Sequence, residues 1–345
     1  MHELTRREFL KRSGNALILT ALGSPFLGAC QTTPPLVRAD GGGAIAGLIA
    51  GPTPNPLQEP GVKVQNVREF NLMTAVAPVD LGTGEFQAWT YNDQAVGPEI
   101  RVTEGEVIRA TLTNHLPDPT TIHWHGIPLP NAMDGVPGVT QAPVQPGETF
   151  VYKFVAWPSG TYWYHPHVGH QLDRGLVGPL IIEPKREPGD YDREYTLLLD
   201  DWVTVDGGAP EVAPRGVGGT MGPGMMGGGM MGRGPRRSGA DDDGPLQEPV
   251  YDVFTVNGQV AEAASPLTVK QGERVRLRLI NASGATIYGL RLAGHPLTIT
   301  HCDGRPVEPL EVDVLRIGMG ERYDVVFSAD NPGRWTLYDT LNGAD

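Results

Sequence analysis

The sequence predicts an all-β protein built from two copies of one Greek-key β-sandwich. Glycine (46) and proline (32) are abundant and charged residues are only 19%, which favours short strands joined by turns over helices. Short alternating apolar runs such as IRVTEGEVIRATLTNHL and ETFVYKFVAW are typical of strands. The two structured blocks also repeat each other, because residues 91–116 align with 256–283 and residues 146–167 align with 319–340.

The repeat is carried by residue types that define turns. Glycines and one asparagine recur at matched positions, so both copies are expected to use the same connections between strands. The matched pairs are Asn114 with Asn281, Gly105 with Gly272, Gly147 with Gly320, and Gly160 with Gly333.

Residues 1–30 are predicted to be an export signal. Twin arginines in RREFLK precede an apolar run that ends near Leu27, which is too short for a membrane span and resembles a twin-arginine signal. The segment LGAC also resembles a lipoprotein processing box, in which Cys30 carries lipid; cleavage near Ala29 without lipid is the other interpretation. Both place the mature chain in the periplasm or another extracytoplasmic compartment, with the twin-arginine machinery as a partner.

The rest of the chain divides by composition. Residues 31–63 are rich in Pro, Gly, Ala and Thr and are predicted to be a flexible linker. The first sandwich is expected over residues 64–188 and the second over residues 189–345. Residues 206–247, which include MGPGMMGGGMMGRGPRR, have almost no branched or aromatic side chains and are expected to be an insertion without a core.

Charge and cysteine content exclude some classes of protein. The formal net charge of -13 makes the surface a poor ligand for nucleic acid, so no nucleic-acid partner is expected. The chain has two cysteines, and one of them lies in the predicted signal. Only Cys302 then remains, so no intramolecular disulfide is expected and stability must come from packing.

Two histidine pairs carry the chemistry. TIHWHGIPLP places His123 and His125 one residue apart, and in a strand such residues point to the same face. YHPH repeats the spacing forty residues later with His165 and His167. Two such strands side by side would bring four neutral imidazoles to one small volume, and imidazole binds Zn, Cu, Fe and Ni.

The motifs HWHG, DGVPGVTQAPVQPGE, GTYWYHPHVGHQ and GLVGPLIIE together resemble the first domain of the multicopper oxidases, a family that includes laccases and bacterial cuprous oxidases. The resemblance covers about Val64 to the C-terminus and implies cupredoxin-like sandwiches. It implies that His123 binds type 2 copper. It also implies that the type 3 copper ligands are His125, His165 and His167.

Asp134 and the methionines have two interpretations each. The family keeps an acid near Asp134 to manage protons, since reducing oxygen to water consumes them; an ordinary Asp-Gly turn is the alternative. The methionines are either part of an inert loop or a collector of Cu(I), because thioethers favour Cu(I). The collector interpretation favours cuprous ion over bulky phenols as substrate. The residues concerned are Met221, Met225, Met226, Met230 and Met231.

A type 1 copper site is not found in the sequence. Such a site needs two histidines, a cysteine and a weak axial ligand, and the family's HPxHxHG and HCHxxxH motifs are missing. GHPLTITHCDG supplies His295, His301 and Cys302, but the repeat aligns His165 with Tyr338 and His167 with Thr340. The second copy is therefore expected to lack ligands, with Cys302 a small buried residue.

The resemblance implies a laccase-like oxidoreductase that oxidises a phenolic or cuprous reductant by one electron and reduces dioxygen to water. The chain is expected to be truncated before a third domain with type 1 copper, and to have little activity alone. The alternatives are a non-catalytic periplasmic copper-binding or scaffold protein of the same fold, and zinc on the same four histidines. The oligomeric state stays open.

Overall fold

The computed structural model describes residues 66–187, 189, 191–204 and 251–342. The predicted signal (1–30), the predicted linker (31–63) and the predicted insertion (206–247), with Cys30 and the five methionines, lie outside the described residues. The described residues form strands β1 to β17. Two short 3₁₀ segments, η1 (Asn131–Met133) and η2 (Leu172–Arg174), lie in the connections, so the all-β prediction is confirmed. Within this part of the chain, no helix has the length and hydropathy needed to cross a membrane.

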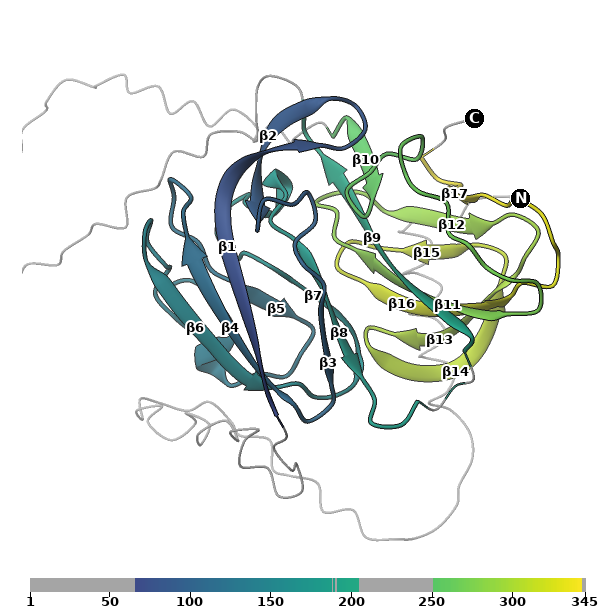
Figure 1. The fold of residues 1–345 in the computed structure, drawn as a ribbon, viewed down its shortest axis with the longest axis horizontal. Helices are drawn as coiled ribbons and strands as arrows, with labels where there is room; N and C mark the ends of the chain where they lie inside the picture. Colours follow the sequence, from purple (N-terminus) through teal and green to yellow (C-terminus); the bar gives the residue numbers. More distant parts are fainter. Residues whose placement is uncertain (1–65, 188, 190, 205–250, 343–345) are drawn as a thin grey trace, which may run out of the picture. The chain divides into compact units, whose positions relative to one another are not determined.

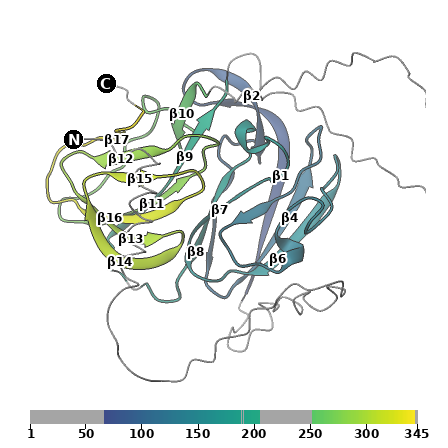
Figure 2. The same cartoon turned by 180° about the vertical axis from the view of Figure 1, so that it is seen from behind.

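The first sandwich is made of two four-stranded sheets. Its strands are β1 (Val67–Asp80), β2 (Glu85–Tyr91), β3 (Ile100–Thr103), β4 (Val107–Asn114), β5 (His123–His125), β6 (Thr149–Val155), β7 (Gly160–His165) and β8 (Gly178–Glu183). One sheet has the order β2-β1-β4-β6 and the other β3-β8-β7-β5. Figures 1 and 2 show β4 between β1 and β6 from both sides. The core between the sheets includes Ile108, Leu112, Trp124, Tyr152 and Phe154.

The second sandwich joins a six-stranded sheet to a three-stranded one. Its strands are β9 (Arg193–Trp202), β10 (Val253–Val256), β11 (Arg274–Asn281), β12 (Tyr288–Leu292), β13 (Leu297–Cys302), β14 (Arg305–Val312), β15 (Leu315–Ile317), β16 (Arg322–Ser328) and β17 (Leu337–Asp339). The sheet orders are β10-β9-β11-β16-β13-β14 and β15-β12-β17. This sandwich has a core of its own, which includes Leu197, Leu279, Leu297 and Val325.

The two copies share their turns, as the repeat predicts. Asn114 ends β4 and its Oδ1 accepts a hydrogen bond from the Leu116 backbone N–H at 2.9 Å. Asn281 ends β11 and its Oδ1 accepts one from the Ser283 N–H at 3.1 Å. The matched glycines also agree: φ is +82° at Gly147 and +77° at its counterpart Gly320. Such angles favour glycine, so the sequence repeat is a repeat of backbone shape.

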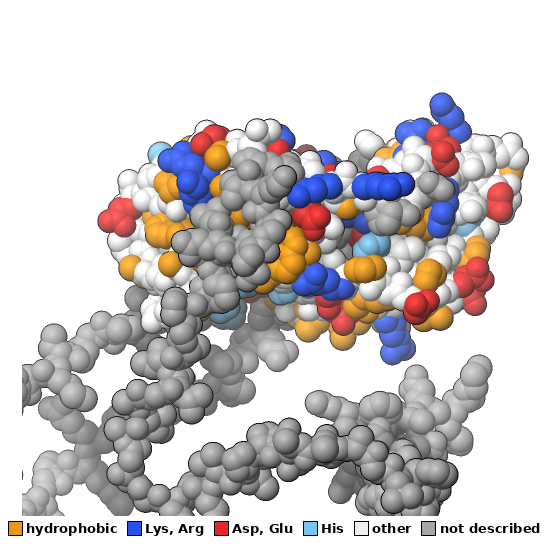
Figure 3. All heavy atoms as spheres, turned by 90° about the horizontal axis from the view of Figure 1, so that it is seen from below, with side chains coloured by type: hydrophobic (Ala, Val, Ile, Leu, Met, Phe, Trp, Pro, Cys, Tyr) orange, Lys and Arg blue, Asp and Glu red, His pale blue; other side chains and the backbone are white. Residues whose placement is uncertain are grey.

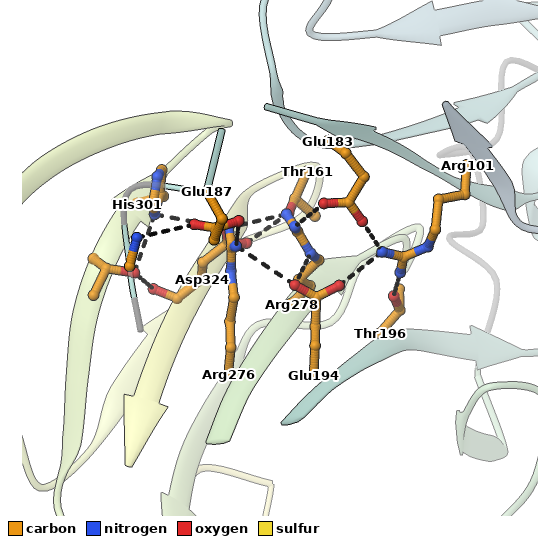
Figure 4. Close-up of polar contacts among 12 residues, drawn as sticks. Arg101, Thr161, Glu183, Glu187, Glu194, Thr196, Arg276, Arg278, His301 and Asp324 are labelled. Carbon is orange, nitrogen blue, oxygen red and sulfur yellow. Dashed lines mark hydrogen bonds and ion pairs between the residues drawn. The ribbon is translucent and has the colours of Figure 1, made fainter. Parts of the chain in front are cut away.

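Strand β7 makes several of the polar contacts between the two sandwiches. Thr161 Oγ1 donates a hydrogen bond to Asp324 Oδ1 at 2.6 Å and accepts one from Arg278 Nη1 at 3.0 Å. Arg276 also pairs with Asp324, whose side chain is 1% exposed. Figure 4 shows this buried network, which continues through Glu194 and Glu183 to Arg101 of β3. Because a buried charge without its partner is costly, the network strongly favours one arrangement of the two sandwiches.

The surface of the described residues carries charges of both signs. On the face seen in Figure 3, lysine and arginine side chains stand among acidic and hydrophobic ones. Some of them form exposed ion pairs, such as Arg109 Nη1 with Glu69 Oε2 at 2.7 Å. Pairs of this kind contribute little to stability. The absence of a nucleic-acid partner stays a prediction.

Candidate metal centre

The HWH segment is split between two faces of its sheet. Trp124 is fully buried in the first core, where its ring packs edge-on against Phe154 with centroids 4.9 Å apart. Because side chains alternate along a strand, burial of Trp124 forces His123 and His125 to the opposite face. The tryptophan is therefore the anchor that directs both imidazoles to one place.

Strand pairing brings the third histidine to the same face. β5 and β7 are antiparallel neighbours, with His123 opposite His165 and His125 opposite Trp163. Ligand nitrogens of His123, His125 and His165 all lie within 4.8 Å of one another. His125 Nδ1 is 3.3 Å from His165 Nε2. We call these three residues the histidine cluster.

His167 lies beside the histidine cluster rather than in it. β7 ends at His165, because Pro166 has no N–H to donate to a neighbouring strand. The expectation that His165 and His167 repeat the strand geometry of the first pair is therefore wrong. His167 is exposed, its backbone N–H donates to Thr121 Oγ1 at 3.2 Å, and its ring centroid is 5.6 Å from that of His123.

Backbone carbonyls orient two of the imidazoles. His123 Nδ1 donates to the Asp134 carbonyl oxygen at 2.8 Å, and His165 Nδ1 donates to the Pro166 carbonyl oxygen at 2.8 Å. With Nδ1 protonated, Nε2 of each ring is free to bind a metal. The carboxylate of Asp134 is also close, with Oδ1 3.3 Å from His123 Nδ1. The predicted acid therefore touches a cluster residue directly.

Gly135 allows Asp134 to reach His123. Its φ is +75°, and a Cβ at this position would lie 1.9 Å from the backbone oxygen of Ile122. The Asp-Gly turn therefore packs against the backbone just before β5, at a distance that only glycine permits. The turn and the contact to His123 are two aspects of one feature, so the two interpretations of Asp134 do not exclude each other.

Burial keeps two members of the histidine cluster neutral. Burial, followed by the charge of Arg322 and by His123, lowers the pKa of His125 to about 3. Burial is also the main cause that lowers the pKa of His165 to about 3, while the Pro166 carbonyl opposes it. Neutral imidazole is the form that binds metals, and it suits copper or zinc. The donor set therefore fits a copper ion at neutral pH.

Two neighbours of the cluster were not predicted. The Trp163 ring stacks on both His125 and His165, with centroids 4.7 and 4.3 Å away, and is 2% exposed. Its place two residues before His165 in a strand was a usable signal. The second is Arg322, which lies next to Gly126 of HWHG. Nothing in the sequence indicates this contact, because it depends on how the sandwiches pack.

Cys302 does not gather with the second copy's histidines. Among the described residues, the only group of three or more metal-ligand side chains found is the histidine cluster. His295 packs against Phe327 and Trp335, while His301 Nδ1 is bonded to Thr300 Oγ1 at 3.1 Å. Cys302 is only partly buried, which corrects the prediction of a buried residue. Cys302 lies at the end of β13, next to the exposed Asp303.

The fold and the site define a class: an all-β protein of two sandwiches that gathers neutral imidazoles for a metal ion. Residues 74–187 and residues 193–344 each match a family model described as multicopper oxidase. The chain belongs to the multicopper oxidase family, whose centres hold copper. The resemblance of the HWHG and YHPH motifs to this family is thereby confirmed.

Individual proteins that are similar to this chain have names that refer to copper. Multicopper oxidase MmcO of Mycobacterium tuberculosis is 41% identical over 256 residues, which are 73% of this chain and 50% of that protein. Copper resistance protein A of Pseudomonas syringae pv. tomato is 33% identical over 82% of this chain and 50% of its own length. The blue copper oxidase from Nitrosomonas europaea superposes with a TM-score of 0.66 at 34% identity, covering 81% of this chain and 80% of that one. The chain spans about half the length of the two curated relatives.

Proposed function

We propose that the histidine cluster, with His167 beside it, holds copper in an oxidase that couples one-electron oxidation of a reductant to reduction of dioxygen to water. One observation carries the proposal: three imidazole nitrogens lie within 4.8 Å of one another in a chain of this family. Following the family's pattern, His123 is the type 2 ligand. His125, His165 and His167 are the type 3 ligands.

The bound copper would supply the redox chemistry, and the protein would supply geometry and protons. The Asp134 and Pro166 carbonyls hold Nδ1 of His123 and His165, so that Nε2 faces the metal position. We propose that the Asp134 carboxylate, 3.3 Å from His123 Nδ1, also holds a proton near the centre. Trp163 covers the cluster on one side and excludes water there.

The substrate and location follow from the relatives and the sequence. The name of copper resistance protein A favours a cuprous reductant, with phenols as the other class. The methionine-rich insertion would then deliver Cu(I) to the centre. We also propose that the two domains span residues 64–188 and 189–345. We further propose that the chain is exported to the periplasm by the twin-arginine machinery and that Cys30 carries lipid.

Copper binding to the purified chain tests the first step. We expect Cu(II) to quench the fluorescence of Trp163, whose ring stacks on two ligand imidazoles, and His165→Ala to abolish most of the quenching at low copper. Trp163→Phe should remove the signal without removing the metal. Quenching that survives in both His123→Ala and His165→Ala would place the copper elsewhere and contradict the proposal.

Three further measurements separate the alternatives. Near-ultraviolet absorption that appears with Cu(II) and is absent with zinc would indicate coupled copper ions, whereas zinc displacing copper at equal concentration favours a zinc site. Copper retained by the chain would support the copper site, whereas failure to retain copper would favour a non-catalytic scaffold. Because little activity is expected of the chain alone, substantial oxygen consumption with a phenolic or cuprous reductant would overturn that expectation.

A further inference from the structure

Arg322 of the second sandwich reaches the strand that carries His165. It begins β16 and is only 4% exposed. Its Nε donates to the backbone oxygen of Thr161 in β7 at 3.3 Å, and its Nη1 donates to the Gly320 carbonyl oxygen at 2.9 Å. The residue therefore ties β7 to the turn that precedes β16.

The other end of the guanidinium lies against the HWHG segment. A Cβ placed on Gly126 would be 2.2 Å from Arg322 Nη2. Gly320, in the turn before β16, lies against the histidine cluster itself: a Cβ at this position would be 3.1 Å from Cε1 of His125. The second sandwich thus presents one glycine and one buried cation to the His125 side of the cluster.

The charge of Arg322 is balanced mainly by Asp303. Asp303 Oδ1 is 3.0 Å from Nη1, but the Asp303 side chain is 50% exposed and therefore partly screened by water. Asp324, two residues further along β16, is committed to Thr161, Arg276 and Arg278 (Figure 4). Because Arg322 Nη2 lies against Gly126, the residue that follows His125, the charge of Arg322 lies close to the cluster.

We propose that Arg322 is a positioning residue of the histidine cluster and that its charge biases bound copper toward Cu(I). A fixed cation next to the site repels a doubly charged ion more than a singly charged one. The inference rests on the proposed copper function. It gives the second sandwich, which lacks ligands of its own in β12 and β17, an electrostatic role at the metal centre.

The ratio of Cu(I) to Cu(II) affinity tests the inference. Each affinity is measured on the purified chain by competition with a chromophoric chelator. We expect Arg322→Gln to lower the ratio about tenfold, the order of effect of removing one nearby charge at an effective dielectric constant of about 20. Arg322→Lys, which keeps the charge, should restore most of it.

Asp303→Asn is a second variant that tests the same charge. The Arg322 backbone N–H donates to Asp303 Oδ1 at 3.1 Å, and an asparagine keeps an oxygen for this bond while removing the negative charge that compensates Arg322. It should therefore raise the ratio. If Arg322→Gln does not fold, this surface variant still decides. Thr161→Val breaks the contact to Asp324 without changing a charge and should leave the ratio unaltered.

The outcomes separate the two proposals. If the ratio is the same in wild type, Arg322→Gln and Asp303→Asn, the electrostatic role of Arg322 is wrong. If both affinities fall together in Arg322→Gln while Asp303→Asn has no effect, Arg322 is merely structural and the inference is equally overturned. If His123→Ala and His165→Ala leave copper affinity unchanged, the proposed copper site itself fails, whatever Arg322 does.

Discussion

His123 and Asp134 are joined by a hydrogen bond of 2.8 Å from the imidazole Nδ1 to the backbone carbonyl oxygen, across eleven residues of chain. The bond sets which nitrogen of His123 faces the cluster. The carboxylate adds a second, longer contact at 3.3 Å. Asp134 thus acts on the site through its backbone and its side chain separately, and mutation can remove only the second.

We expect Asp134→Ala to weaken copper binding about tenfold, the lower end of what loss of an outer partner of a ligand costs, because the carbonyl remains. Asp134→Asn should bind copper nearly as well as wild type. Copper titration against a competing chelator measures both. Equal copper affinity of Asp134→Ala and wild type would show that the Asp134 side chain does not support copper binding and that the residue only forms the turn.

Gly135→Ala and Gly138→Ala form a matched pair in one loop. Both glycines have positive φ, +75° and +71°, but a Cβ at Gly135 would strike the Ile122 oxygen whereas one at Gly138 meets nothing within 4 Å. We expect Gly138→Ala to cost about 1 kcal/mol for the backbone conformation. Gly135→Ala should cost about 3 kcal/mol or more and weaken copper binding.

Urea unfolding of the metal-free variants measures the two losses in free energy of unfolding. Copper titration measures the weaker copper binding expected of Gly135→Ala. Equal destabilisation by the two substitutions would show that the close approach at Ile122 does not constrain the loop.

The buried network between the sandwiches should be sensitive to loss of one partner. Asp324→Asn leaves Arg276 and Arg278 buried with less compensation, so we expect a loss of about 3–5 kcal/mol in the free energy of unfolding. The exposed pair of Arg109 and Glu69 is the control, where Glu69→Gln should cost less than about 1 kcal/mol. Denaturant unfolding compares them. A cost for Asp324→Asn as small as that of Glu69→Gln would contradict the expectation.

The lowered pKa values of His125 and His165 predict an acid-sensitive metal-free protein. Between pH 6.5 and about 3 the unfolded chain protonates these imidazoles while the folded chain does not. Stability should therefore fall as the pH falls through this window and be fully present above it. Each histidine contributes a slope of about 1.4 kcal/mol per pH unit in mid-window. His165→Gln should reduce the slope by that amount, whereas parallel curves would contradict it.

The sequence was sufficient for most features that depend on local spacing. Alternation around Trp124 predicts that His123 and His125 share a face, and the aligned glycines predict turns that recur in both copies. His167 departs from expectation because Pro166 ends β7, a local signal that the repeated spacing obscured.

Contacts between the sandwiches were beyond prediction. Arg322 and Gly320 reach the cluster only because β7 and β16 pack together, and no spacing within either copy encodes that packing. The partial exposure of Cys302 likewise depends on where β13 ends in space. Trp163 is an intermediate case. Its position two residues before His165 predicts that it shares a face with that histidine, but its stacking on two imidazoles could be predicted only from the pairing of β5 with β7.

The matching turns at Asn114 and Asn281 indicate whether the protein folds before or after it binds copper. In the second copy the same turn leads from β11 to β12, and the described residues of that copy gather no group of metal-ligand side chains, so this architecture needs no ion as a template. The first copy has its own buried core and the same turn. Its polypeptide should therefore reach its final shape before copper arrives, with loading as the last step of maturation.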